Sequence, residues 1–302
     1  MKVPLVDGTY ELFRHFYGVP PHRNRHGREV AAVGGVLASV LSLLSDGATH
    51  IGVATDHVIE SFRNDLWPGY KTGGGVDPAL LGQFDLFEES LSCMGVVVWP
   101  MVDLEADDAL ASAAKTAAGD PAVSQVIICT PDNDLGQCVA GTRVVQLDRR
   151  KAALIDEDGV RAKFGVGPAS VPDYLALVGD SADGFPGLPG WGPKSAAAVL
   201  ARFGHLEAIP DDPARWDVAV RGGAGLAATL ASQRELALLF RDLATLRTSP
   251  AVIASAEELR WTGATVAFDA LCDEVLDSPG LAARARRLAA GSGTQGPPNT
   301  SG

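Results

Sequence analysis

Short β-branched segments alternate with longer amphipathic segments through the first half of the chain, and this alternation limits the folds open to it. The expected strands are Lys2–Val6, His50–Ala54, Val96–Trp99, Gln125–Cys129 and Arg143–Leu147. Apolar residues at helical spacing lie between them, in Glu29–Leu44, Pro78–Met94 and Asp107–Ala118. Strands separated by helices form βαβ units, so we expect an α/β fold with a mainly parallel central sheet flanked by helices.

The pattern changes after about residue 165, where the chain becomes rich in Ala and Leu with glycine turns. The segments expected to be helices are Val171–Leu177, Lys194–Phe203, Gly225–Leu239 and Phe268–Leu276. We therefore expect a first domain at residues 1–165 and a second, helical domain at 166–288. Residues 289–302 contain little that could be buried, and we expect a disordered tail there.

Carboxylates follow the apolar segments at several separated places. In parallel sheets, ligands bind at the carboxyl ends of the strands, where acids that follow different strands meet. Carboxylates brought together repel one another unless cations lie among them, so the pattern predicts bound metal ions. Taken singly, these acids also suit ordinary roles as helix-terminus residues or Asx turns. The candidate ligands are Asp7, Asp56, Glu105, Asp107, Asp108, Asp132, Asp134, Asp180 and Asp183.

The residue types in these clusters indicate which metal they would bind. Histidine and cysteine are absent from them, which disfavours zinc. The TPDND and GDSADG loops lack the following glutamate that an EF-hand requires. Ligand sets made only of oxygen suit magnesium or manganese.

The segment GLPGWGPK is the most specific string in the chain. Its glycines allow a tight turn with exposed backbone amides, and Pro193 suits the first turn of a following helix. Amides at a helix N-terminus bind phosphate, and Lys194 and Ser195 add a charge and a hydroxyl. The plain alternative is a loop between two helices, which rarely needs three glycines and two prolines.

Charge and composition leave the partner open. The formal net charge of −12 argues against nucleic acid at first sight. Nine of the carboxylates belong to the proposed metal site, however, so much of the negative charge is concentrated there and a local basic surface remains compatible with it. No apolar run approaches the ~18–20 residues that span a bilayer, and no signal peptide is evident. The four cysteines form no CxxC pair, which is typical of a reduced, cytoplasmic protein.

The segment SFRNDLWPGYK places two basic residues after the strand that precedes Asp56. Arg63 and Lys71 would be solvated surface residues by default, but their proximity to the acids favours contact with a substrate. His57 is expected to be an exposed residue without a role, because a metal can generate hydroxide without a histidine base.

Together the strings LVDGTY, DHVIESFRNDLWPGYK, LEADD, TPDNDLGQ and DYLALVGDSADGFPGLPGWGPKSA resemble the flap endonuclease and 5′→3′ exonuclease family. The family includes the N-terminal nuclease domain of bacterial DNA polymerase I, and the resemblance covers roughly residues 3–200. It implies a PIN-like nuclease core with a helical arch around residues 66–94, and a helix–three-turn–helix DNA-binding domain. It also implies two Mg²⁺ or Mn²⁺ ions held by the nine acids, with K⁺ at the GLPGWGPK hairpin. The resemblance assigns Lys71 and Arg63 to catalysis, and Arg14, Tyr70, Gly187, Gly190, Gly192, Lys194 and Ser195 to DNA binding.

Two departures from the family pattern bear on function. Members usually continue YK as YKxxR, whereas Gly74 stands here at the arginine position, which belongs to the base of the arch. An acidic stretch follows at residues 83–89, so we expect a weakly basic or mobile arch. Asn133 replaces a lysine between two retained acids.

The resulting hypothesis is a monomeric, stand-alone nuclease that hydrolyses DNA phosphodiesters by a two-metal mechanism. It would act on 5′ ends or flaps in replication and repair, in the bacterial cytoplasm at the nucleoid, without a small-molecule cofactor. Two alternatives remain: a catalytically weak module that binds branched DNA, and a PIN-like ribonuclease. The GLPGWGPK segment disfavours the ribonuclease.

Overall fold

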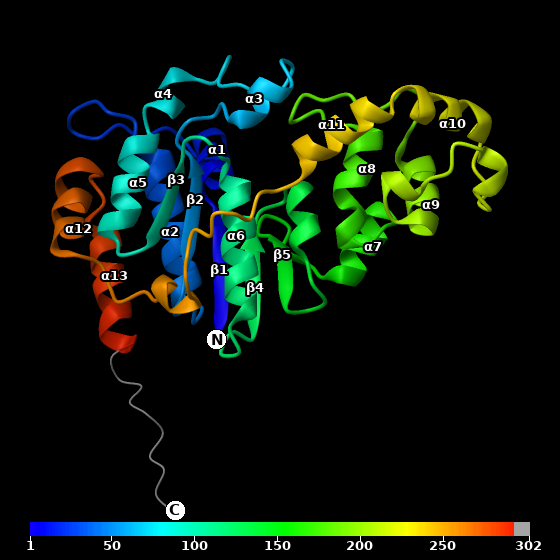
Figure 1. The fold of residues 1–302 in the computed structure, drawn as a ribbon. Helices are drawn as coiled ribbons and strands as arrows, with labels where there is room; N and C mark the ends of the chain where they lie inside the picture. The colour runs from blue at the N-terminus through cyan, green and yellow to red at the C-terminus, as the bar shows by residue number, and fades with distance from the viewer. Residues whose placement is uncertain (293–302) are drawn as a thin grey trace, which may run out of the picture.

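A six-stranded sheet forms the centre of the molecule, and its strands are arranged in the order β3-β2-β1-β4-β5-β6 (Figure 1). The computed structural model describes residues 1–292. The strands are β1 (Lys2–Asp7), β2 (Gly52–Asp56), β3 (Val97–Met101), β4 (Gln125–Cys129), β5 (Val144–Asp148) and β6 (Ala153–Ile155). The first five strands are parallel, which confirms the predicted fold class.

The strand order places a topological switch point at the centre of the sheet. From β1 the chain moves outward to β2 and β3, and then crosses to β4 and β5 on the other side. The carboxyl ends of β1, β2 and β4 therefore meet at one edge, where ligands bind in sheets of this kind. The antiparallel strand β6 was not predicted, because three residues after a turn are too few to show a period.

Helices cover both faces of the sheet. One face packs against α1 (Gly8–Gly18), α2 (Ala31–Ser45) and α5 (Phe84–Cys93) in a core of mostly branched and aromatic side chains. The other face packs against α6 (Ala106–Gly119), whose buried residues are mostly alanine and allow close approach to the sheet. The predicted helices at 29–44 and 107–118 are confirmed within two residues.

A second, helical unit lies beside the sheet and has its own core (Figure 1). It consists of α7 (Glu157–Phe164), α8 (Val171–Val178), α9 (Pro193–Phe203), α10 (Gly223–Ser232) and α11 (Arg234–Ala244). The helix predicted at 225–239 is two helices, because the backbone leaves the helical conformation at Gln233.

The chain does not remain in this helical unit up to residue 288, as the sequence had suggested. Residues 246–259 pack against the face that α6 covers, through Leu246, Ile253 and Leu259. Then α12 (Val266–Ala270) and α13 (Pro279–Ser292) pack beside α2 and α5, on the side away from the helical unit (Figure 1). The predicted C-terminal limit of the helical domain, residue 288, differs from this packing, because the apolar faces of α12 and α13 complete the first core.

The expected arch around residues 66–94 is short. It comprises α3 (Phe62–Leu66), a loop and the single turn α4 (Pro78–Leu81), which lie above the sheet edge (Figure 1). The helix predicted at 78–94 breaks at Gly82, and its second part, α5, packs on the core through Phe84, Phe87 and Leu91.

The tail predicted at 289–302 is helical in its first residues, because α13 continues to Ser292. The remainder of that prediction lies outside the described residues. Within residues 1–292, no helix is both long enough and apolar enough to cross a bilayer.

Candidate metal centre

Three acids of the predicted site are held in place by the starts of helices at the switch point. Asp7 ends β1 and is the N-cap of α1, where its Oδ1 accepts a hydrogen bond of 2.8 Å from the amide of Tyr10. Asp56 ends β2, and its Oδ1 accepts one of 2.7 Å from the amide of Ala106, at the start of α6. Asp107 occupies the first turn of α6. The local sequence of strand followed by helix thus turns these carboxylates towards one edge.

Seven aspartates form two groups that meet at Asp132. The electrostatic field of Asp132 acts on Asp7 and Asp107, and Asp7 and Asp107 both interact with Asp56. On the other side, Asp132 acts on Asp134 and Asp183, and Asp180 also acts on Asp134. The structure therefore places each of these aspartates within electrostatic reach of others in the set: Asp7, Asp56, Asp107, Asp132, Asp134, Asp180 and Asp183.

The protonation behaviour of these acids shows how poorly their charges are balanced by the chain itself. Burial, together with Asp56 and Asp132, raises the pKa of Asp7 to about 7. Burial and neighbouring carboxylates raise the pKa values of Asp107 and Asp134 well above their ordinary range. Groups of this kind bind either protons or cations at neutral pH.

The Oδ1 atom of Asp134 is the clearest candidate for a metal-binding oxygen. Asp134 is 4% exposed, and its Oδ1 is buried without a hydrogen-bond partner among residues 1–292. Buried carboxylate oxygens are ordinarily paired, so this atom fits a cation ligand. The all-oxygen donor set fits magnesium or manganese.

Lys71 and Tyr70 connect the segment above the sheet to the acids. The Lys71 Nζ lies 2.9 Å from Glu105 Oε2 and 3.3 Å from Asp183 Oδ1. The Tyr70 hydroxyl lies 3.2 Å from each of the same two carboxylates. Although burial opposes it, the charges of Lys71 and Arg63 hold the pKa of Glu105 below its ordinary value. Glu105 is thus an ionised partner of basic side chains, at the border of the acid groups.

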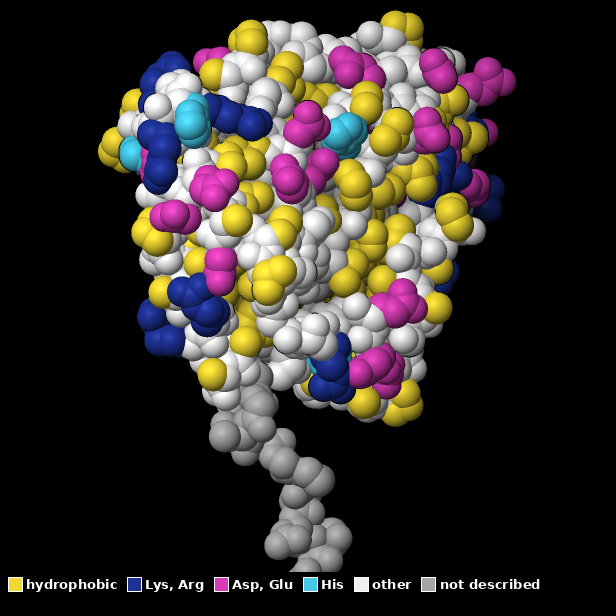
Figure 2. Space-filling model, turned by 90° about the vertical axis from the view of Figure 1, so that its left-hand side faces the viewer, with side chains coloured by type: hydrophobic (Ala, Val, Ile, Leu, Met, Phe, Trp, Pro, Cys, Tyr) yellow, Lys and Arg dark blue, Asp and Glu magenta, His cyan; other side chains and the backbone are white. Residues whose placement is uncertain are grey.

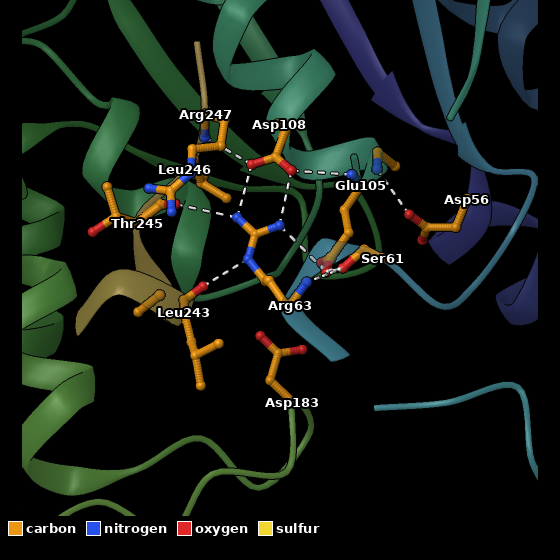
Figure 3. Close-up of polar contacts among 12 residues, drawn as sticks. Asp56, Ser61, Arg63, Glu105, Asp108, Asp183, Leu243, Thr245, Leu246 and Arg247 are labelled. Atoms are coloured by element: carbon orange, nitrogen blue, oxygen red, sulfur yellow. Dashed lines mark hydrogen bonds and ion pairs between the residues drawn. The ribbon is translucent and has the colours of Figure 1, made fainter. Parts of the chain in front are cut away.

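Arg63 is 1% exposed and lies between Asp108, Glu105 and Leu243 (Figure 3). Its five N–H donors all have acceptors: both oxygens of Asp108 at 2.8 Å, Glu105 Oε1 at 3.3 Å, and the carbonyls of Leu243 and Thr245. It therefore cannot contact a substrate, and the prediction that Arg63 is catalytic is wrong on this geometry. Arg63 instead joins α3 and α6 to the end of α11.

The carboxylate oxygens of Asp108 are also fully engaged in hydrogen bonds. Besides the two bonds from Arg63, it accepts the backbone amides of Glu105 and Arg247 at 3.0 and 2.7 Å. Four donors use the roughly four lone-pair positions of a carboxylate, so Asp108 has no position left for a metal ion, contrary to the prediction. The charge of Arg63 outweighs burial and keeps the pKa of Asp108 below its ordinary value.

A cavity of about 300 Å³ opens over the first group of acids. Asp7, Asp56, Asp107 and Asp132 line it from the sheet, and Lys71 and Thr72 line it from the segment above. Phe13, Ile59 and Val76 supply its apolar walls. Lys71 therefore brings a basic side chain to the wall of this cavity.

The GLPGWGPK segment forms the turn between α8 and α9, and its glycines have different roles. Gly187 (φ +70°) is buried against Gly179, whose amide nitrogen would lie 2.4 Å from an added Cβ. Its role is close packing, so the prediction that it contacts DNA is wrong, as is that for Tyr70, which is 3% exposed. Gly190, Gly192, Lys194 and Ser195 line a second cavity, of about 630 Å³.

Sequence reasoning missed several residues of these sites. Arg221 lines the second cavity together with Lys194, and nothing in the local sequence, an arginine before two glycines, predicts this. Thr130 donates to Asp7 Oδ2 at 2.9 Å, and Ser61 donates to Glu105 Oε1 at 2.5 Å. Arg14, a predicted DNA ligand, is on α1, where its guanidinium bonds Glu11; its side chain is 31% exposed.

Comparison with known protein families decides the relationship. Residues 2–165 match the family described as "5'-3' exonuclease, N-terminal resolvase-like domain", and residues 166–267 match "5'-3' exonuclease, C-terminal SAM fold". The chain belongs to the 5'-3' exonuclease family. The predicted resemblance is thereby confirmed, and the family is one of DNA-binding nucleases.

The most similar curated relatives of this 5'-3' exonuclease family member include DNA polymerases I. That of Pseudomonas aeruginosa is 35% identical over 254 residues, which are 81% of this chain and 27% of the polymerase. That of Mycobacterium tuberculosis is 36% identical over 256 residues, 81% of this chain and 28% of the polymerase. The chain therefore spans little more than a quarter of the length of these relatives.

Solved structures share the fold at lower identity. The T5 D15 protein co-crystallised with metal ions has a TM-score of 0.65 at 18% identity, covering 96% of this chain and 100% of that one. The catalytic core of Rad2 in complex with DNA substrate has a TM-score of 0.62 at 18% identity, covering 95% and 91%. Both likenesses concern the architecture.

Proposed function

We propose that this chain is a structure-specific 5′ nuclease that hydrolyses DNA phosphodiesters with two divalent cations. The observation that carries the proposal is the arrangement of two acid groups meeting at Asp132, with the buried, unpaired Oδ1 of Asp134 in the second. One group is supplied by Asp7, Asp56, Asp107 and Asp132. The other is supplied by Asp132, Asp134, Asp180 and Asp183.

The cations, when bound, would lower the pKa of an attacking water and stabilise the leaving 3′-oxygen. The residues of the chain hold and orient the reacting groups. Lys71 faces the first cavity, so its ammonium would offset charge that develops on the scissile phosphate. Glu105 and Asp183 keep Lys71 protonated, because both carboxylates lie against its Nζ and raise its pKa.

We propose that duplex DNA binds through the turn between α8 and α9. Its second cavity is lined by Gly190, Gly192 and Ser195 together with the cations Lys194 and Arg221. Backbone amides and these cations suit phosphates, which gives preference for DNA structure over sequence. We also propose that a potassium ion binds at this turn, and that the exposed part of Arg14 contacts DNA.

One assay separates this function from its alternatives. A 5′-labelled flap, a nicked duplex and single-stranded RNA are each incubated with Mg²⁺ or Mn²⁺, and with a chelator. Short 5′ products from the DNA substrates in either metal, and none with the chelator, are expected. Cleavage of RNA alone would instead identify a ribonuclease. Tight binding of the flap without products in either metal would identify a branched-DNA-binding module.

The same assay supports a role in replication and repair if nicked and flapped duplexes are preferred over blunt duplex. The proposed monomer is tested by light scattering of the protein alone and with a flap.

A further inference from the structure

A second set of possible metal ligands lies outside the acid groups. His57 follows β2, and Asp85 and Glu88 lie one helical turn apart on α5. One ligand atom from each of the three lies within 4.8 Å of the others. We propose that His57, Asp85 and Glu88 bind a divalent transition metal, at a site separate from the acid groups of the proposed nuclease centre.

Hydrogen bonds hold the Glu88 carboxylate in a position that suits metal binding. Its Oε1 accepts a hydrogen bond of 2.6 Å from the Thr55 hydroxyl, and its Oε2 lies 2.8 Å from His57 Nδ1. Metal-binding carboxylates are commonly oriented by such an outer hydrogen bond, which here comes from the buried strand β2. The Glu88 side chain is only 12% exposed, whereas that of His57 is 38% exposed, so an ion can enter from solvent.

The donor set indicates a different metal from that of the nuclease centre. An imidazole nitrogen with two carboxylates suits Zn²⁺, Co²⁺ or Ni²⁺, whereas ligands made only of oxygen suit Mg²⁺. Three protein ligands leave positions for water. Acidic side chains gather in the upper part of the face that carries α5, α12 and α13, with a histidine among them (Figure 2).

The position of the site means that a bound ion would connect two elements beside the nuclease centre. His57 directly follows Asp56, a proposed ligand of the nuclease centre, and α5 follows the loop and the short α4 above that centre. An ion held by His57, Asp85 and Glu88 would therefore fasten the start of α5 to the end of β2. Binding would restrain the C-terminal base of the segment that covers the first cavity.

The test is a calorimetric titration of the whole protein with Zn²⁺, in millimolar Mg²⁺ that competes with Zn²⁺ for the acid groups. The wild type is expected to bind one Zn²⁺. The His57→Gln and Glu88→Gln variants are expected to lose at least about tenfold in affinity, since removing even an outer partner of a ligand costs roughly 10–100-fold. Hydrogen exchange in α5 is expected to slow on addition of Zn²⁺ in the wild type but not in these two variants.

The matched control is Glu89→Gln, which makes the same change of charge at the exposed neighbouring position and should bind Zn²⁺ like the wild type. The proposal is overturned if the wild type binds no Zn²⁺, or if His57→Gln binds it with unchanged affinity. It is also overturned if Asp132→Asn abolishes Zn²⁺ binding while His57→Gln leaves it intact, because the ion would then occupy the acid groups. These readouts do not depend on DNA cleavage.

Discussion

Asp132 is the residue through which the two acid groups interact. Its carboxylate acts electrostatically on Asp7 and Asp107 in one group and on Asp134 and Asp183 in the other. We expect Asp132→Asn to reduce cleavage of a 5′ flap below detection while leaving duplex binding largely unchanged, because the turn that we propose to bind DNA is formed elsewhere. Cleavage is measured with a labelled flap, and binding by fluorescence anisotropy in Ca²⁺.

A second readout of the same variant is independent of activity. Loss of one like charge should make the chelator-treated protein more stable to heat, because the remaining acids repel one another less. The control is Asp158→Asn, which changes an exposed residue of α7 in the same way and should alter neither property. Unchanged turnover in Asp132→Asn would remove Asp132 from the proposed centre.

The sequence predicted which residues would gather at the site better than what each of them does there. Asp7, Asp56 and Asp132 could be placed because each follows a recognisable strand. The role of Arg63 could not, since its carbonyl partners lie 180 and 182 residues further along the chain. A sequence motif shows only which residues are near one another in the chain. Whether a side chain is buried, and which groups it bonds to, depends on contacts with distant parts of the chain.

At the scale of elements, the segment between α3 and α4 carries the departure from the family pattern at Gly74. Here an added Cβ would meet only the Thr72 hydroxyl, at 3.2 Å, and solvent surrounds the residue. We expect Gly74→Arg to raise cleavage about tenfold, since one charge-assisted hydrogen bond to phosphate contributes roughly 1.5–3 kcal/mol. Single-turnover rates on the flap substrate measure the effect.

Two controls separate charge from backbone effects in that segment. Gly74→Gln adds length without charge and should leave the rate near that of the wild type. Gly75→Arg carries the charge at φ +89°, a conformation that strains any residue with a Cβ, and should gain less. Equal rates for Gly74→Arg and Gly74→Gln would show that the missing charge does not limit cleavage.

Elements with a clear period were predicted well, and the failures have physical causes. The five parallel strands were found because each contains a short run of apolar and β-branched residues, although β3 is only partly buried. The helix predicted at 78–94 was divided because Gly82 and Gln83 interrupt an otherwise helical pattern. The return of α12 and α13 to the first core was missed, since an apolar helix face does not specify which sheet or helix it packs against.

At the scale of the whole molecule, the Arg63–Asp108 pair joins the helical unit to the sheet. Through the carbonyls of Leu243 and Thr245 it fixes the end of α11, at the point where the chain returns from the helical unit. We expect Arg63→Met to lower the free energy of unfolding by about 3–5 kcal/mol, because it leaves the buried Asp108 carboxylate without its cation. Urea denaturation followed by tryptophan fluorescence measures the loss.

The double variant Arg63→Met/Asp108→Leu tests the cause. Replacing both members of a buried ion pair by apolar residues is often close to neutral, so the double variant should be more stable than Arg63→Met alone. If it is less stable, the carbonyl contacts of Arg63 account for the loss rather than the isolated carboxylate.

The stability of the whole molecule should also depend on pH in opposite ways with and without metal. Burial and nearby carboxylates raise the pKa of Asp7 from 3.8 to about 7, and the pKa values of Asp107 and Asp134 are raised in the same direction. The folded state therefore retains protons that the unfolded chain has already released, and its stability falls as the pH rises from about 4 through about 7. In a chelator, the melting temperature should be lower near pH 8 than near pH 5.5. Mg²⁺ should reverse this difference by replacing the protons, and Asp7→Asn should reduce the fall in the chelator. A melting temperature that rises with pH in the chelator would contradict the crowding of these acids.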